Sequence, residues 1–141
     1  MAVRHLIPAL AAVALLFVSG PASAGGAPRS PTERLRLLAA CTGRLTAEVQ
    51  FAWLVAPGTA DALQSGRDRF DALLLSRMAE ALAGGMPEGQ AMTWRVSEWA
   101  VQRDLLEAGL FATDPGLAAR AKRRAEDRRA ECVSLLDERG A

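Results

Sequence analysis

The chain has few of the side chains on which most enzymes depend. Its 141 residues include no tyrosine and a single histidine, His5. His5 lies in an N-terminal segment that we expect to be removed, so the mature chain has no imidazole to act as a general base or metal ligand. The motifs G-x-S-x-G, H-E-x-x-H and C-x-x-C-H are also absent. These absences argue against an enzyme, a metal site and a cofactor.

An excess of charge of one sign is lacking as well. The chain has 17 Lys and Arg residues against 16 Asp and Glu, and removal of Arg4 makes the two counts equal. The densest basic run extends from Arg120 to Arg129, but Glu126 and Asp127 interrupt it. Its charges surround a whole helix, so we interpret it as a solvated face and expect no nucleic-acid partner. Anionic lipid headgroups remain the alternative ligand of this run.

The first 24 residues have the pattern of a secretory signal peptide. A basic head, Arg4 and His5, precedes an apolar run over residues 6–18, and small residues then end in Ala22-Ser23-Ala24. The apolar run is shorter than the roughly 20 residues that a membrane-spanning helix needs. The pattern predicts cleavage near Ala24–Gly25 and a periplasmic or secreted protein with no transmembrane segment after cleavage. The alternative is an uncleaved signal anchor.

Turn and capping signals divide the rest of the chain into helices. Residues 25–30 are predicted to be a flexible lead-in, and Ser30-Pro31-Thr32-Glu33 has the spacing of a capping box. Pro57-Gly58, Gly84-Gly85 and Asp114-Pro115 then mark helix ends. We therefore predict helices over residues 31–55, 60–83, 87–112 and 115–138. The expected fold is a single all-α domain over residues 31–139, an antiparallel up-down-up-down four-helix bundle.

Each predicted helix has one apolar face that we expect to point into the core. On the first two helices this face comprises Leu35, Leu38, Leu45, Val49, Ala52, Trp53, Leu63, Phe70, Leu74, Met78 and Ala81. On the last two helices it comprises Trp94, Val101, Leu105, Ala108, Leu117, Ala121, Ala125 and Leu135.

The two cysteines, Cys41 and Cys132, are predicted to form a disulfide. An even number of cysteines in an oxidising compartment favours a bridge over free thiols. In an antiparallel bundle both cysteines lie at a similar height on the first and fourth helices, which Ala118, Ala121 and Ala125 allow to approach closely. The same register brings Glu48 within reach of Arg124 or Arg128, so it predicts an ion pair there.

The segments around the cysteines are LLAACTGRL and AECVSLL. Together with the leader, they resemble small helical periplasmic proteins of Gram-negative bacteria that have one cysteine in the first helix and one in the last, a group with no assigned activity. The resemblance implies the compartment and the disulfide, and it carries over no functional residues.

A second apolar stripe on the third helix is the candidate functional surface. Met92, Trp99, Leu106 and Leu110 lie within about 40° of one another on a 3.6-residue period. Since this stripe is separate from the inner face, we predict a site that contacts a protein partner or a second copy of the chain. The alternative is that loops or residues 25–30 cover the stripe, or that an irregular bundle buries both apolar faces of this helix.

Two other functions remain open. One is a carrier of a small molecule or lipid, with a cavity between helices lined by Trp53, Trp94 and Met78. The other is a hydrolase without a recognisable motif. Of the three, a non-enzymatic interaction module acting through the outer face of the third helix is the preferred hypothesis.

Overall fold

The computed structural model describes residues 30–140, which form four helices and one short 3-10 turn. The elements are α1 (Pro31–Val55), η1 (Pro57–Thr59), α2 (Ala60–Ala83), α3 (Gln90–Phe111) and α4 (Pro115–Gly140). No strand occurs in this part of the chain, so the all-α prediction is confirmed. The predicted signal peptide over residues 1–24, and the lead-in except Ser30, lie outside the described residues.

Local capping explains where the helices begin and end. The Ser30 hydroxyl accepts a hydrogen bond from the backbone N–H of Glu33, whose carboxylate accepts one from the N–H of Ser30, so the predicted capping box is present. Gly85 ends α2 with a φ of +90°, a conformation that glycine adopts without strain. The carboxylate of Asp114 caps α4 by accepting from the N–H groups of Gly116 and Leu117.

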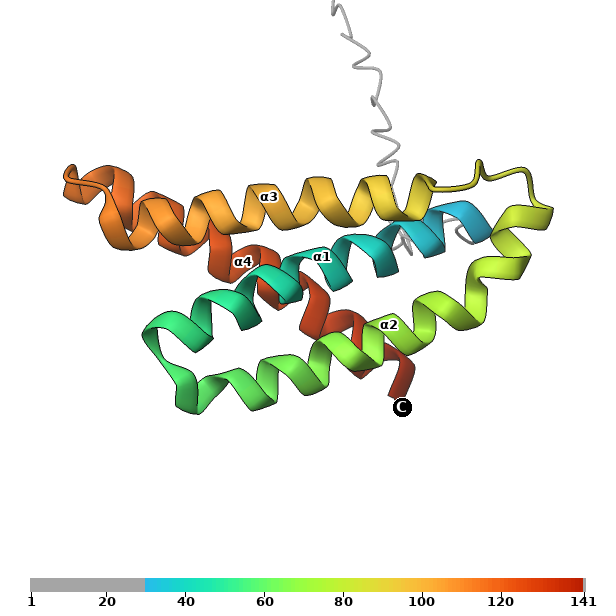
Figure 1. Cartoon of the computed structure of the whole chain (residues 1–141), viewed down its shortest axis with the longest axis horizontal. Coiled ribbons are helices and arrows are strands. Elements are labelled where there is room, and N and C mark those ends of the chain that lie inside the picture. Colours follow the sequence, from blue (N-terminus) through green and yellow to red (C-terminus); the bar gives the residue numbers. More distant parts are fainter. Residues whose placement is uncertain (1–29, 141) are drawn as a thin grey trace, which may run out of the picture.

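Helix α1 is central, and it packs mainly against α2 and α3 (Figure 1). It runs opposite to α2 and in the same direction as α3, while α4 runs diagonally to the other three and packs mainly on α3. The α1–α3 contact depends on Gly43, because a Cβ atom at this position would overlap the carbonyl oxygen of Arg95. From this close approach the two helices diverge toward their C-terminal ends.

The apolar core lies mainly between α1 and α2. Its buried members from these helices include Leu35, Leu38, Leu45, Phe70, Leu74 and Ala81, as the periodicity predicted. Trp94 and Met78 pack against the same core. The inner faces of α1 and α2 were therefore correctly predicted over most of their length.

Three residues predicted to face inward are exposed instead. The exposed fraction is 53% for Trp53, 43% for Val101 and 47% for Leu117. Trp53 lies in the last turns of α1, beyond the point where α1 and α3 diverge, and Leu117 lies in the first turn of α4. Val101 is exposed because α3 turns the neighbouring Gln102 toward the interior, where it is fully buried.

The predicted disulfide between Cys41 and Cys132 is present and joins α1 to α4. The two Cα atoms are 5.5 Å apart, within the usual range for a bridge, and both cysteines are buried. Ala121 and Ala125 are also buried, as expected of small residues at a helix contact. The bridge therefore fixes the point where α4 crosses α1.

Candidate functional site

The stripe predicted on α3 lies at the edge of the exposed face of this helix. Met92 and Leu110 are 59% and 51% exposed, whereas Trp99 and Leu106 are half-buried. The structure adds Val96, which is 52% exposed and lies between Met92 and Trp99 on the same face. Sequence reasoning missed Val96 because it followed seven-residue steps, although alternating steps of four and three residues find it.

We define the α3 ridge as the row that these steps trace along the helix. It consists of Met92, Val96, Trp99, Arg103, Leu106 and Leu110.

Trp99 is held at the centre of the α3 ridge by two contacts. Its indole Nε1–H donates a hydrogen bond to Oε1 of Gln50 on α1, at 2.8 Å. The guanidinium carbon of Arg103 lies 5.0 Å from the centroid of the tryptophan ring, within the range of a cation–π contact. Trp99 therefore helps to pack α3 on α1 and also presents part of its ring at the surface.

The two ends of the α3 ridge border different hollows. Met92, Val96 and Trp99 line a shallow groove of about 170 Å³ together with Thr46 and Gln50 of α1. Leu106 and Leu110 line a deeper cleft of about 310 Å³ at the other end of the helix. The four residues predicted from the sequence thus belong to one helix edge, although they do not meet in one pocket.

The deeper cleft lies where α1 and α3 diverge. Phe51 and Val55 of α1 and Leu63 of α2 supply apolar lining opposite Leu106 and Leu110. Small-molecule sites are mostly apolar hollows of about 300–1,000 Å³, so the cleft is at the small end of that range.

The cleft is not the cavity predicted from the sequence. None of the three residues expected to line that cavity, Trp53, Trp94 and Met78, lines the cleft. Trp94 and Met78 pack against the core instead, and Trp53 is exposed.

The cleft is lined by as many acidic as basic residues. Lys122, Glu126 and Arg129 of α4 line it together with Glu48 of α1. Burial raises the pKa of Glu48 above its usual value and Glu126 adds to this effect, although Gln102 and Arg129 act to lower it. The cleft can hold an apolar group beside a buried carboxyl.

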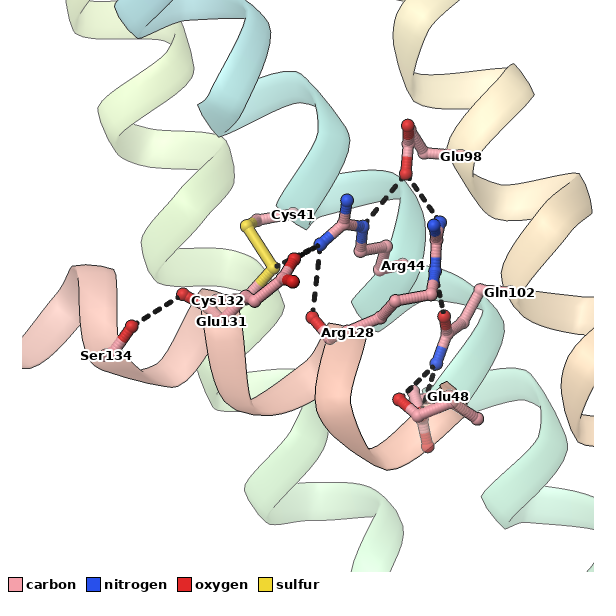
Figure 2. A network of polar contacts seen from close by, with 10 residues as sticks. Cys41, Arg44, Glu48, Glu98, Gln102, Arg128, Glu131, Cys132 and Ser134 are labelled. Carbon is pink, nitrogen blue, oxygen red and sulfur yellow. Dashed lines mark hydrogen bonds and ion pairs between the residues drawn. A yellow bond between two sulfur atoms is a disulfide. The ribbon is translucent and has the colours of Figure 1, made fainter. Parts of the chain in front are cut away.

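A polar network next to the cleft joins α1, α3 and α4 (Figure 2). The guanidinium of Arg44 donates to Glu98 at 2.9 Å and to Glu131 at 2.8 Å. The guanidinium of Arg128 donates to the same oxygen of Glu98 at 2.6 Å and to Oε1 of Gln102 at 2.9 Å. Burial acts to raise the pKa of Glu98, but the hydrogen bonds and charges of Arg44 and Arg128 outweigh it and hold that pKa below its usual value.

Gln102 links this network to Glu48. Its side-chain Nε2–H group donates to Oε1 of Glu48 at 2.7 Å and to the carbonyl oxygen of Ala125 at 3.0 Å. Glu48 faces α4, as the register predicted, but the predicted partner was wrong. Arg129 pairs with Glu48 at 3.5 Å, whereas Arg128 pairs with Glu98.

The network also corrects the interpretation of the basic run as a wholly solvated face, because Arg128 and Arg129 are half-buried within it. Every buried side-chain nitrogen and oxygen in the described part of the chain has a hydrogen-bond partner. The network therefore stabilises the packing of three helices.

Among the side chains of residues 30–136, no group of three His, Cys, Asp or Glu is placed to hold a metal ion. No helix in that range combines the length and apolar character needed to cross a membrane. Comparison of the chain with protein-family models, with curated proteins and with solved structures found no match.

Proposed function

We propose that this chain is a non-enzymatic protein-interaction module that binds its partner through the α3 ridge. The observation that carries the proposal is the exposure of Met92, Val96 and Leu110, each more than half exposed, along one edge of a single helix. Aligned apolar side chains that include methionine and an aromatic residue are typical of contact surfaces. Helix α2 also exposes Leu75 and Leu82, which lie seven residues apart on one face, but this row is shorter than the α3 ridge.

We propose further that residues 1–24 direct export and that the mature chain works in the periplasm or outside the cell as an antiparallel helical bundle. The A-x-A sequence before Gly25 supports a cleavage site. The Cys41–Cys132 bridge supports an oxidising compartment, where disulfides persist. Mass spectrometry of the protein from its native host should give a chain that begins at Gly25, and a chain that retains residues 1–24 would contradict cleavage.

Site-specific photo-cross-linking in the producing cell tests the contact surface. A photoreactive amino acid at Val96 should give a covalent adduct with a protein. The same amino acid at Leu75, which is 72% exposed on α2, should give none and is the matched control. Equal adduct yields at both positions, or no adduct at Val96, would contradict a specific contact through the α3 ridge.

A second candidate function, carriage of a small apolar molecule, is favoured by the 310 Å³ cleft. The neutral fluorescent probe N-phenyl-1-naphthylamine should then bind, and Val55→Glu should abolish binding because Val55 lines the cleft. Met92→Glu is the control, because Met92 lies at the other end of α3 and should leave probe binding unchanged. Binding that survives Val55→Glu would contradict a site in this cleft.

A further inference from the structure

We propose that the partner of the α3 ridge is a second copy of this chain, and that the two ridges pack antiparallel about a two-fold axis. This inference rests on the proposed interaction function and specifies the partner at the same surface. The axis would cross the α3 ridge between Trp99 and Arg103, midway between Met92 and Leu110 along the helix.

Self-complementarity of the α3 ridge supports a second copy. When two such helices lie antiparallel about this midpoint, Met92 of one copy lies opposite Leu110 of the other, and Val96 lies opposite Leu106. Trp99 then lies opposite Arg103 of the second copy. Apolar side chains therefore meet apolar side chains at both ends, and an aromatic ring meets a guanidinium at the centre, as a two-fold interface requires.

Charge distinguishes the antiparallel from the parallel arrangement. In a parallel pair, Arg103 would lie opposite Arg103 of the second copy. Glu107, which is close to Arg103 on α3, would lie near Glu107 of the second copy. Like charges in such positions are destabilising. In the antiparallel pair, Arg103 lies opposite Trp99 of the second copy instead. The same two side chains already make a cation–π contact within one chain.

The size of the ridge indicates how tightly two copies would bind. From Met92 to Leu110 the helix rises about 27 Å, at 1.5 Å per residue. One helix pair of this length is at the small end of protein interfaces, which is typical of transient complexes. We therefore expect a reversible dimer with a dissociation constant in the micromolar range.

Sedimentation equilibrium of the purified protein, from low to several hundred micromolar, tests the dimer. The protein should pass from monomer to dimer, and Met92→Glu combined with Val96→Glu should weaken association by at least about tenfold. Leu75→Glu is the control, since it adds the same charge to an exposed leucine on α2 and should leave association unchanged. A protein that stays monomeric throughout, or one that Leu75→Glu weakens equally, would overturn the inference.

Disulfide trapping tests the orientation. A mixture of Met92→Cys chains with Leu110→Cys chains should oxidise to a mixed dimer, identified by peptide mapping. Met92→Cys chains alone should not cross-link, because the two thiols would be about 27 Å apart. Efficient cross-linking of Met92→Cys chains alone would overturn the antiparallel pairing.

The two proposals fail in different ways. An adduct at Val96 that contains another protein, together with a monomeric purified chain, would leave the interaction function standing and overturn the second copy as partner. Absence of any adduct at Val96 would overturn both proposals.

Discussion

Glu48 carries a buried carboxyl that accepts hydrogen bonds from Gln102 and Arg129. Burial raises the pKa of Glu48 in the folded protein, so the folded state takes up a proton more readily than the unfolded chain. Protonation of Glu48 therefore stabilises the folded protein. This stabilisation is fully present below the usual pKa of 4.5, and it is lost as the pH rises through the pKa that Glu48 has in the folded state.

Glu48→Gln removes this titration. As the pH is lowered from 7 toward 4.5, the wild type should gain free energy of unfolding relative to the variant. Urea unfolding of both proteins at several pH values measures the difference. A difference that does not change with pH would contradict the raised pKa.

For Glu98→Gln, the difference in free energy of unfolding between wild type and variant should change with pH in the opposite direction. The pKa of Glu98 lies below its usual value of 4.5, so the folded protein holds the ionised carboxylate more strongly than the unfolded chain does. The wild type should therefore lose free energy of unfolding relative to Glu98→Gln as the pH falls below 4.5 through the folded pKa. The same urea series tests this, and slopes of equal sign for the two variants would contradict the account of the network.

Gly43 is the residue on which the α1–α3 contact depends. Gly43→Ala should cost about 1–3 kcal/mol of stability, because its Cβ meets the backbone of Arg95, which cannot move aside as a side chain can. Gly66→Ala is the matched control within α2, where the new Cβ would lie 3.7 Å from Leu45, an ordinary contact. That variant should gain up to about 1 kcal/mol from helix propensity. Equal effects at the two glycines would contradict the close approach of α1 and α3.

At the scale of the helices, their ends were predictable because each is encoded by a few neighbouring residues. The capping box at Ser30, the glycines after Ala83 and the cap at Asp114 act locally, and all three are present as predicted. The start of α3 was predicted less accurately, since the helix begins at Gln90 rather than near Pro87. Gly89, with a φ of +79°, precedes the helix, so the turn after α2 is longer than the sequence indicated.

The inner face of α3 could not be predicted from apolar periodicity. Gln102 and Glu98 take inward positions because Arg44 of α1 and Arg128 of α4 lie opposite them. Arg44 and Arg128 belong to helices that are distant from α3 in the sequence. The sequence alone therefore does not show that they meet Glu98 and Gln102. The exposed edge of α3 was partly predicted because a second apolar stripe is a property of the helix alone.

Asp114→Ala should cost about 1 kcal/mol of stability, because the N–H groups of Gly116 and Leu117 lose their acceptor. Thermal unfolding gives the cost, and hydrogen exchange should show the loss of protection concentrated in the first turn of α4. Asp104→Ala is the control, since Asp104 is exposed within α3 and caps no helix. Loss of protection throughout α4 would contradict a local capping role.

At the scale of the whole molecule, the disulfide ties α4 to the rest of the fold. Cys41 and Cys132 are 91 residues apart, and closing a loop of that length stabilises a protein by about 4 kcal/mol in the chain-entropy model. Replacing both cysteines with alanine should lower the free energy of unfolding by a similar amount while leaving helix content nearly unchanged at low temperature. Circular dichroism during urea unfolding measures both, and an unchanged midpoint would contradict the role of the bridge.

The α3 ridge is proposed to bind a partner through Met92, Val96 and Leu110, which are exposed and therefore contribute little to the fold. The most direct test of this claim is the photo-cross-linking yield at Val96, measured with and without Leu110→Glu in the same chain. Because Leu110 is half exposed, we predict that the yield falls by at least about tenfold while the free energy of unfolding changes by less than about 1 kcal/mol. An unchanged yield, or a loss of yield that only accompanies unfolding, would contradict the claim.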